Sequence, residues 1–482
     1  MKPGLLVMKF GGTSVGSAER IAAAADLVSQ AARTRPVVAV VSAMSKVTDA
    51  LLETMRRAEA GDLAGMESNI RELERRHLDV CRALFPAGQQ PAVTAAVRGL
   101  LKEFDRICQG ILMLGEKPPR SVDEAVATGE KLSAGIVAAL LECRGVPAAA
   151  VNGSEVIVTD AAFGNASPIL DKTRARAEKV LGPHIAANTV PVVTGFNGAT
   201  ADGRPTTLGR GGSDFSASIL AAVLDAEELW IWTDVDGIMT ADPRVVADAA
   251  VLEEVSYNEA AELAYNGAKV LHPRTLAPLI EKQIPVWSKN SFRPELPGTK
   301  IVPRISDASG VRAITSLARV AMITIEAVNA SMQGAQLMAR ALDALARVNV
   351  ELLLLSRSSY RQNFCMLVRS EELEMAMESL ESGLALELAH GYLHPIAVDE
   401  SVGLLAIVGE GMRGTPGLAG RLFTAISREK INIIAIAQGS SELTIAIVVK
   451  RDMLDKAVRA VHAEYRLGER KPAARQELGQ AH

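Results

Sequence analysis

Two glycine-rich turns, separated by about two hundred residues, constrain the fold of this chain more than any other feature. The first turn, KFGGTS, occupies residues 9–14, and the second, GRGGSD, occupies residues 209–214. Glycine allows backbone N–H groups to approach an anion closely, and the first turn of a helix adds partial positive charge. Because each turn also carries a cation, Lys9 or Arg210, we predict that both turns bind phosphate or another anion.

Both turns lie between a segment that can form a strand and an alanine-rich helical pattern. The same alternation of short β-rich runs and longer helical stretches extends from residue 5 to about residue 290. It predicts an α/β fold with an open, mostly parallel sheet sandwiched by helices, in which ligands bind at the carboxyl ends of strands. Strands are expected at residues 5–10, 37–41, 148–151, 190–196, 229–233 and 285–289, and helices follow the turns at residues 17–32 and 213–224.

The composition is that of a globular protein with several domains, since 482 residues are too many for one compact core. No apolar stretch approaches the ~18 residues that a membrane span needs, and a net charge of −4 gives no reason to expect a nucleic-acid partner. The first expected strand leaves no room for a targeting segment, so we predict a cytoplasmic location. Four scattered cysteines and seven histidines without ligand spacing predict no metal site built from them.

Two segments interrupt or follow the α/β pattern. Residues 48–119 are rich in Arg, Glu, Leu and Ala, which predicts solvated helices packed on one edge of the first domain; a partner-binding surface is the alternative. Residues 293–310 contain Pro294, Pro297 and Pro303, which interrupt any regular element. We expect this second segment to be a linker.

After the linker the chain repeats itself with an offset of 83 residues. Gly334 and Gly417 each precede a helical pattern, and Asn349 and Asn432 each follow one at the start of a further strand. Each copy continues with a hairpin-like loop, a β run and another helix. The repeat predicts two small βαββαβ units, which are usually paired.

The second copy contains GEGMRG at residues 409–414, a match to the GxGxxG pattern of dinucleotide-binding sites. The strand that follows ends at Gln438 without the acidic residue that would bind a ribose. The same layout also recurs 83 residues upstream without the glycine pattern. We therefore interpret residues 409–414 as a ligand loop of the small βαββαβ unit, with the dinucleotide site as the alternative.

Five ordered motifs carry a resemblance to a known family. They are KFGGTS at residues 9–14, TGE at 128–130, GRGGSD at 209–214, TDVDG at 233–237 running to TADPR at 240–244, and GAKVLHP at 267–273. In this order they resemble the aspartate kinases of the amino-acid-kinase superfamily, and the tandem units resemble the ACT regulatory domains of that family. The similarity is greatest to the kinase half of the bifunctional aspartokinase/homoserine dehydrogenases.

The resemblance implies an enzyme that uses ATP and Mg²⁺ to phosphorylate the β-carboxylate of L-aspartate, the first step of lysine, threonine and methionine synthesis. An ionised carboxylate, with a pKa near 4, needs no general base at pH 7. The alternatives are a kinase of the same fold that acts on glutamate, and an amino-acid sensor with a degenerate kinase domain. The implied parts are a kinase domain at residues 1–292, a linker at 293–310, ACT-like units at 311–395 and 396–470, and a polar tail at 471–482.

The resemblance also implies a role for each site residue. Lys9 stabilises the transferring phosphoryl group, and Asp214 orients Lys9 or a metal-bound water; N-terminal helix capping is the alternative for Asp214. For Glu130 the alternative is a carboxylate that complements a helix dipole. The implied aspartate-binding residues are Thr48, Glu130, Arg210, Gly211, Gly212 and Ser213. The implied ATP-binding residues are Lys9, Phe10, Gly11, Gly12, Thr233, Asp234, Met239, Arg244, Lys269 and Val270.

Regulation is implied by the second ACT-like unit. Its stretch IAQGSSE at residues 436–442 resembles the effector-binding segment of regulated relatives, with Gln438 as the main contact and Asn432 and Ile433 beside it. The first copy, at residues 355–362, lacks the matching glutamine. The effector expected is lysine, threonine or both, and pairing of ACT units predicts a homodimer or a higher homo-oligomer.

Overall fold

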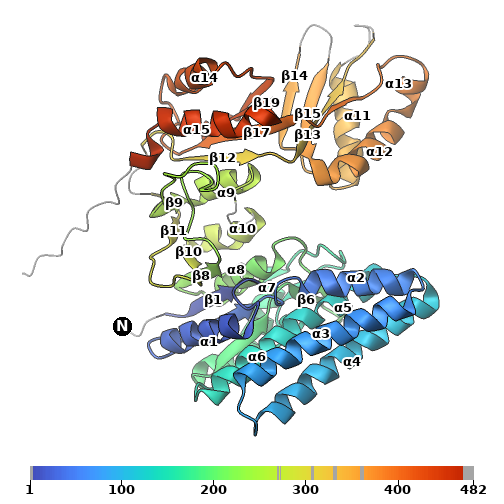
Figure 1. Cartoon of the computed structure of the whole chain (residues 1–482), viewed down its shortest axis with the longest axis vertical. Coiled ribbons are helices and arrows are strands. Elements are labelled where there is room, and N and C mark those ends of the chain that lie inside the picture. The colour runs from blue at the N-terminus through green and yellow to red at the C-terminus, as the bar shows by residue number, and fades with distance from the viewer. Residues whose placement is uncertain are drawn as a thin grey trace, which may run out of the picture. The chain divides into compact units, whose positions relative to one another are not determined.

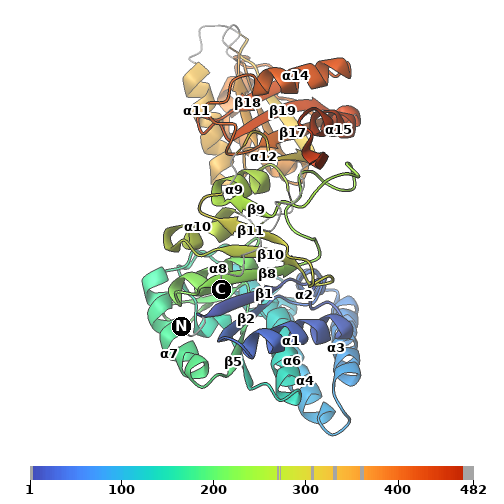
Figure 2. The ribbon, with the colours of Figure 1, turned by 90° about the vertical axis from the view of Figure 1, so that its left-hand side faces the viewer.

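The computed structural model describes residues 4–268, 271, 273–305, 309–328, 334–358 and 363–469. The chain divides into two compact units. The first unit contains the described residues of 4–238, 253–257 and 271–304, and the second contains those of 239–252, 258–268 and 305–469. Figures 1 and 2 show both units, and each is described by itself below.

The first unit is built on one large sheet. Its strands are β1 (Leu6–Phe10), β2 (Val37–Val41), β3 (Ala148–Val151), β5 (Val190–Thr194), β8 (Glu228–Thr233), β9 (Glu254–Ser256), β10 (Val286–Asn290) and β11 (Thr299–Val302). They are ordered β3-β5-β2-β1-β8-β10-β11-β9, and every pairing from β3 to β10 is parallel. The predicted α/β fold with a mostly parallel sheet is confirmed, and all six expected strands are present.

The central strands are apolar because helices cover both faces of the sheet. Every residue of β1, β2 and β5 is buried, as expected for parallel strands with no solvent-exposed face. One face packs against α1 (Ala18–Ala32) and α6 (Thr128–Cys143). The other packs against α7 (Leu170–Ala186), α8 (Gly212–Val223) and α10 (Pro273–Lys282), as Figure 2 shows.

The predicted helical insertion consists of α2 (Val47–Glu59), α3 (Leu63–Leu84) and α4 (Gln90–Leu114), which lie side by side in Figure 1. A short helix, α5 (Pro119–Val126), follows. The apolar sides of the long helices share one core with β1 and α1 through Leu51, Met66 and Phe104. Their outer sides carry exposed ion pairs such as Arg75 with Glu72 and Asp79, each of which adds little stability. The segment therefore enlarges the core of the first unit.

A small three-stranded sheet precedes the second glycine turn in the chain. It consists of β4 (Val158–Thr159), β6 (Asn197–Thr200) and β7 (Pro205–Thr207), in the order β4-β6-β7. The chain leaves β7 and enters the glycine turn two residues later. This hairpin fixes the direction in which the turn approaches α8.

The second unit contains two antiparallel sheets. One has the order β12-β17-β19-β18 and consists of β12 (Ala313–Leu317), β17 (Val402–Val408), β18 (Ala435–Gln438) and β19 (Thr444–Lys450). The other has the order β14-β15-β13-β16 and consists of β13 (Val320–Ile325), β14 (Leu354–Arg357), β15 (Phe364–Arg369) and β16 (Ala397–Asp399). Helices α14 (Leu418–Arg428) and α15 (Leu454–Glu464) cover the first sheet, and α11 (Gly334–Arg347) and α12 (Leu373–Gly383) cover the second (Figure 1). The two predicted ACT-like units are confirmed.

The dinucleotide alternative for residues 409–414 is wrong. The strand before this loop, β17, pairs antiparallel with β19 and with β12. A dinucleotide site requires a parallel βαβ unit, in which the helix crosses over to a neighbouring parallel strand. The loop instead connects two parts of an ACT fold.

Two strands differ from the expected division of the repeat. Strand β12 falls within residues 311–395 but pairs with β17, and β16 falls within residues 396–470 but pairs with β13. Strand β16 follows the first ACT-like unit directly and completes its βαββαβ order, so that unit extends beyond residue 395. Strand β12 alone crosses to the sheet of the other ACT-like unit. A period-two apolar pattern predicts that a strand exists but not which strand it joins. Val320, Leu354 and Val402 lie in one core shared by both sheets.

Two further parts of the chain group with the second unit. Within residues 239–252, Thr240 O accepts a hydrogen bond from Ile314 N at 2.7 Å, and Thr240 Oγ1 lies 3.0 Å from Nε2 of the buried His462. Residues 258–268, which include most of α9 (Tyr257–Tyr265), pack beside the ACT sheets. None of the described helices has the length and apolar content needed to cross a membrane. The large sheet continues past residue 292, because β11 pairs with β10 and β9, so the expected linker at residues 293–310 contains a strand. The other domain bounds remain predictions.

Candidate active site

The register of the large sheet aligns the carboxyl ends of its central strands. Phe10, at the end of β1, pairs with Val41 of β2 and Trp232 of β8. Val41 in turn pairs with Thr194 of β5, and Asn290 of β10 pairs with Thr233 of β8. The loops after five strands therefore begin at one edge of the sheet, where open α/β folds bind their ligands.

The first glycine turn is held between β8 and the loop that follows β2. Gly11 N donates to Trp232 O at 3.2 Å, and Ser45 N donates to Gly12 O at 3.1 Å. A Cβ atom on Gly12 would lie 3.0 Å from the carbonyl oxygen of Ala43, so a side chain at this position would press on the neighbouring backbone. Glycine is required here by close approach.

A pair of buried serines joins this turn to the ends of two other strands. Ser14 Oγ lies 2.7 Å from Ser291 Oγ, and Ser291 Oγ donates to Thr233 O at 3.0 Å. Sequence reasoning missed Ser291 because no motif marks it, and it quoted Ser14 without assigning it a role. The hydroxyl chain positions the turn and Thr233 relative to each other.

The second glycine turn needs glycine for its backbone conformation. Gly209 and Gly211 have φ values of 74° and 69°, in the left-handed region that other residues rarely adopt. Gly212 begins α8, and a Cβ atom there would lie 2.5 Å from Cδ2 of Phe196. Arg210 is exposed between the two left-handed glycines. The backbone thus presents Arg210 at the start of α8.

A buried carboxylate that sequence reasoning missed supports this turn. Asp123, on α5, accepts hydrogen bonds from Gly164 N at 2.8 Å, Thr207 N at 3.0 Å and Thr207 Oγ1 at 2.7 Å. Burial raises the pKa of Asp123, and these hydrogen bonds oppose the increase. Because Thr207 ends β7, Asp123 fixes the strand from which the second turn departs. No motif around Asp123 indicated this role.

An ion pair links the two glycine turns directly. Lys9 Nζ lies 2.5 Å from Asp214 Oδ1, and the two side chains are only 9% and 23% exposed. A Cβ atom on Gly11 would lie 3.6 Å from the same Nζ, so the ammonium faces the first turn as well. The N-cap residue of α8 is Gly211, without a side-chain cap, so the capping alternative for Asp214 is wrong. The cation predicted beside the first turn is thus oriented by the carboxylate beside the second.

A second buried carboxylate completes the cluster. Glu130 is 3% exposed, and its Oε1 accepts a hydrogen bond from Ala43 N at 3.1 Å. Its Oε2 has no hydrogen-bond partner among the described residues. Burial raises the pKa of Glu130 to about 8, opposed by the bond from Ala43 and, more weakly, by the charge of Lys9. Glu130 lies in the first turn of α6, as the dipole alternative requires, but its burial and open oxygen suit a cationic ligand better.

The other predicted substrate residues lie on the loops and helix starts of this edge. Ser213 packs against the end of β5, since a Cβ atom on Gly195 would lie 2.9 Å from Ser213 Oγ. Thr48 is the second residue of α2 and is half-buried. Phe10 stacks on Trp232 with ring centroids 6.2 Å apart, on the face of the sheet opposite Lys9. The roles of these residues remain predictions.

The predicted nucleotide residues divide between the units. Thr233 ends β8 and Asp234 follows it, both in the first unit. Met239 and Arg244 belong to the second unit, where Arg244 Nη2 pairs with Asp242 Oδ2 at 2.6 Å. The remaining two, Lys269 and Val270, lie outside the described residues. The structure thus joins the two glycine turns through Lys9 and Asp214. The contacts of the remaining residues with aspartate and with adenine remain predictions.

The carboxylates at this edge could supply Mg²⁺ with only one or two protein ligands. Within the described ranges no three His, Cys, Asp or Glu side chains gather as a metal cluster. Asp214 is the carboxylate beside both turns, and it already pairs with Lys9. Mg²⁺ commonly keeps several waters and binds one or two carboxylates plus substrate phosphates, which agrees with this arrangement.

The predicted effector residues surround a separate pocket in the second unit. A cavity of about 250 Å³ is lined by Met412, Gly414, Gly417, Gln438 and Glu442 among others. The predicted ligand loop and Gln438 thus face one cavity. Asn432 and Ile433, exposed and half-buried, are not among its lining residues. The effector role of all three residues remains a prediction.

Known proteins resemble the chain along nearly its whole length. Residues 4–290 match the profile of the amino acid kinase family, and residues 405–465 match that of the ACT domain. The chloroplastic bifunctional aspartokinase/homoserine dehydrogenase 1 of Arabidopsis thaliana is 35% identical over 470 residues, 96% of this chain and 51% of that protein. The aspartokinase of Schizosaccharomyces pombe is 32% identical over 495 residues, 96% of this chain and 92% of that protein.

The fold has a solved counterpart as well. Escherichia coli aspartokinase III in complex with aspartate and ADP superposes with a TM-score of 0.81 at 27% identity, covering 95% of this chain and 99% of that one. The chain spans about half the length of the bifunctional relatives that it matches. The likeness therefore extends over both units described here.

Proposed function

Because the chain belongs to the amino acid kinase family and, within it, to the aspartokinases, we propose that it transfers the γ-phosphate of ATP to the β-carboxylate of L-aspartate. The product is 4-phospho-L-aspartate, the first intermediate of lysine, threonine and methionine synthesis. The observation that carries the proposal is the 2.5 Å ion pair between Lys9 and Asp214, which joins the two glycine turns in one site.

The reaction brings two anions together, and the site offers charge to neutralise them. The β-carboxylate is already ionised at pH 7, so no general base is needed and the lack of a histidine among the site residues is no obstacle. Lys9 and the amides of Gly11 and Gly12 stabilise the transferring phosphoryl group, and Asp214 holds Lys9 in place. Arg210 binds the α-carboxylate of aspartate through its planar fork, and Glu130 binds the α-ammonium.

Mg²⁺ supplies further neutralisation of the phosphate oxygens when it is bound. Asp214 is the residue that would help to hold it, directly or through a metal-bound water. The chain's own residues perform the remaining tasks: they bind the two substrates, orient them in line, and keep the site positively charged at the transferring group. The likeness to an aspartokinase solved with aspartate and ADP supports this assignment of substrates.

Trapping the acyl phosphate tests the function and its alternatives. Hydroxylamine converts an acyl phosphate to a hydroxamate, so the purified chain is offered ATP, Mg²⁺, hydroxylamine and one amino acid at a time. We expect hydroxamate from aspartate. Hydroxamate from glutamate alone would assign the chain to the glutamate-directed alternative, and none from either would favour the sensor with a degenerate kinase domain.

The buried Glu130 predicts a distinctive pH dependence. Its pKa of about 8 in the folded chain means that the free site holds a protonated Glu130 below pH 8, whereas an ammonium ligand requires the ionised form. We expect kcat/KM for aspartate to rise up to about tenfold per pH unit below pH 8 and to level off above it. The Glu130→Gln variant should have a higher KM for aspartate and should lose this rise.

The pH dependence of stability gives an independent measure of the raised pKa of Glu130. The folded pKa of Glu130 lies above its ordinary value of 4.5, so the unfolded chain loses this proton first as the pH rises. The free energy of unfolding should therefore fall between about pH 4.5 and pH 8, and less so in Glu130→Gln. An unaltered pH–rate profile together with an unaltered pH–stability profile in the variant would remove Glu130 from both roles.

Feedback control is proposed through the second ACT unit. Gln438 lines the cavity beside the loop at residues 409–414, and an amino-acid effector, lysine or threonine, would contact it there. If either amino acid inhibits the parent chain, Gln438→Ala should raise the inhibitor concentration for half-inhibition roughly tenfold, as expected for one lost hydrogen bond to a charged ligand. Arg428→Ala, an exposed change on α14 that breaks a pair with Glu464, is the matched control and should behave as the parent. Undiminished inhibition in Gln438→Ala would place the effector elsewhere.

Location and assembly complete the proposal. We retain the cytoplasm as the place of action and a homodimer, or a higher homo-oligomer, as the assembled form, since ACT units usually pair. Sedimentation of the purified chain measures the second point directly.

A further inference from the structure

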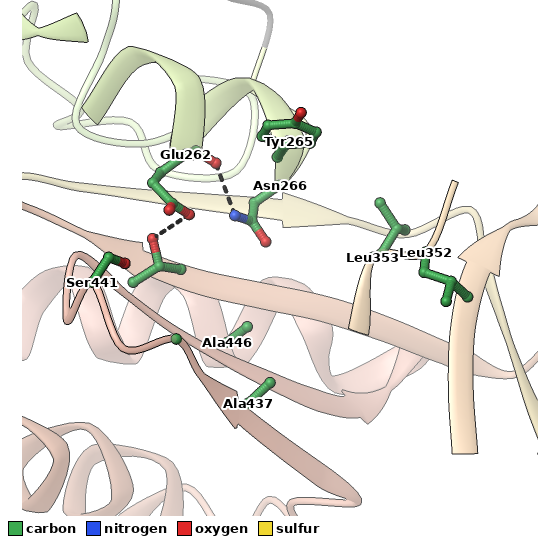
Figure 3. A pocket seen from close by; sticks show the side chains of 10 residues that line it. Glu262, Tyr265, Asn266, Leu352, Leu353, Ala437, Ser441 and Ala446 are labelled. Carbon is green, nitrogen blue, oxygen red and sulfur yellow. Dashed lines mark hydrogen bonds between the residues drawn. The ribbon is translucent and has the colours of Figure 1, made fainter. Parts of the chain in front are cut away.

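A second pocket in the second compact unit is lined in part by Ala437, Gly439 and Ser441, which belong to the same stretch 436–442 that contains Gln438. It has a volume of about 240 Å³ and lies among α9, the residues that lead into β14, and the β18–β19 hairpin (Figure 3). Its polar side chains are those of Glu262, Tyr265, Asn266, Ser441 and Thr444. All of these residues belong to the second unit. The pocket shares no lining residue with the cavity around Gln438.

The orientation of the Asn266 amide is set by its neighbour. Asn266 is buried, and its Nδ2 donates to the backbone oxygen of Glu262 at 2.8 Å. A carbonyl oxygen only accepts hydrogen bonds, so the nitrogen of the amide must face it. The amide oxygen of Asn266 is therefore turned the other way, toward the interior of the pocket, as Figure 3 shows. It offers an acceptor there.

Glu262 offers a second acceptor with a full negative charge. Its Oε2 accepts a hydrogen bond from Thr444 Oγ1 at 2.8 Å, which holds the half-buried carboxylate beside the pocket. Across the described ranges, no Lys, Arg or His lies within ion-pair distance of this carboxylate. A partly buried carboxylate is stabilised when a cation comes close to it. The pocket thus combines a negative charge with an adjacent acceptor.

The opposite wall is apolar. Leu352 and Leu353 line one side, and Ala437 and Ala446 form the floor (Figure 3). The volume is below the ~300–1,000 Å³ typical of pockets for drug-sized ligands, so a ligand of few atoms fits. A positively charged head beside Glu262 and Asn266 with a short aliphatic stem against the leucines satisfies both walls.

We propose that this pocket binds a small aliphatic primary ammonium ion, with its NH₃⁺ group between the Glu262 carboxylate and the Asn266 amide oxygen and its hydrocarbon stem against Leu352 and Leu353. Among the described lining residues Glu262 is the sole charged one, so nothing there balances a carboxylate on the ligand. The pocket therefore selects a simple amine over an amino acid of the same length. It differs in this respect from the proposed effector cavity around Gln438.

Calorimetric titration of the full chain tests the proposal without measuring activity. The probe is n-pentylammonium chloride, and its matched comparisons are L-norleucine, which adds an α-carboxylate, and 1-pentanol, which lacks the charge. We expect saturable one-to-one binding of n-pentylammonium and at least about tenfold weaker binding of both comparisons. Equal binding of 1-pentanol, or no saturable heat with n-pentylammonium, would overturn the proposal.

Three variants locate the binding site. Glu262→Gln keeps the shape and the bond to Thr444 but removes the charge, and it should weaken n-pentylammonium binding about tenfold or more. Ala437→Leu fills the pocket from its floor and should abolish binding by a different mechanism. Gln438→Ala, at the neighbouring position of β18 but in the other cavity, should leave binding unchanged. Binding that survives both Glu262→Gln and Ala437→Leu would place the amine elsewhere. Because no step uses catalysis, failure here is distinguishable from failure of the kinase proposal.

Discussion

Lys9→Met is expected to lower kcat by about 10²-fold or more while it leaves the KM for aspartate nearly unchanged. The ammonium of Lys9 faces the first glycine turn and is held by Asp214 of the second, so it acts on charge that develops during transfer. An interaction made mainly in the transition state affects kcat rather than ground-state binding. Methionine keeps the length of the stem in this buried position.

The sheet provides a matched control for this variant. Lys289 lies on β10 opposite Trp232, one register position beyond Lys9, and on the other face of the sheet, where its Nζ is 5.2 Å from the ring centroid of Trp287. Lys289→Met should keep kcat close to the parent value. Coupled measurement of ADP release at saturating ATP and varied aspartate gives kcat and the KM for aspartate. A Lys9→Met enzyme with near-parent turnover would contradict the proposed role of the ion pair.

Arg210→Ala should produce the second large effect, an increase of roughly ten- to hundredfold in the KM for aspartate, because a charge-assisted hydrogen bond of about 1.5–3 kcal/mol is lost. Two left-handed glycines present this guanidinium at the start of α8, next to Ser213 and Asp214. Arg210→Lys keeps the charge but not the planar fork, so it should fall between the parent and Arg210→Ala.

An arginine on the neighbouring hairpin serves as the control. Arg204 lies before β7 and pairs with Asp202 at 2.9 Å on the surface of the same small sheet. Arg204→Ala removes one positive charge from the same region of the unit but no proposed contact. Its KM for aspartate should equal that of the parent. An unchanged KM in Arg210→Ala would remove Arg210 from the substrate site.

Local patterns in the sequence were sufficient to predict most strands of the large sheet. The six expected strands and the helices after both turns follow from runs of apolar residues and glycine placement within short windows, whereas the pairing of Lys9 with Asp214 was implied by the family resemblance. Parallel order then aligns the strand ends automatically, because successive right-handed crossovers return each strand in the same direction. For the same reason, the sequence could predict that ligands bind at this edge of the sheet.

Long-range partners were not predictable in this way. Ser291 contacts Ser14 across 277 positions, and Asp123 holds Thr207 across 84, yet neither is part of a recognisable motif. The pairing of β12 with β17 was not predicted because an apolar pattern of period two does not indicate which strand is the neighbour. Side-chain pairing and strand neighbours depend on tertiary packing, which a single sequence does not display.

The pairing of β12 with β17 also bears on how the two ACT-like units form during synthesis. Thr315 of β12 pairs with Ala406 of β17, so the sheet around α14 and α15 stays open until both ends of the interleaved region have left the ribosome. The intervening sheet, with α11 and α12, is likewise incomplete until Ala397–Asp399 arrives. A cut near residue 395 leaves each sheet one strand short, so neither fragment is a natural folding module. The two sheets also share one apolar core, which contains Val320 and Val402.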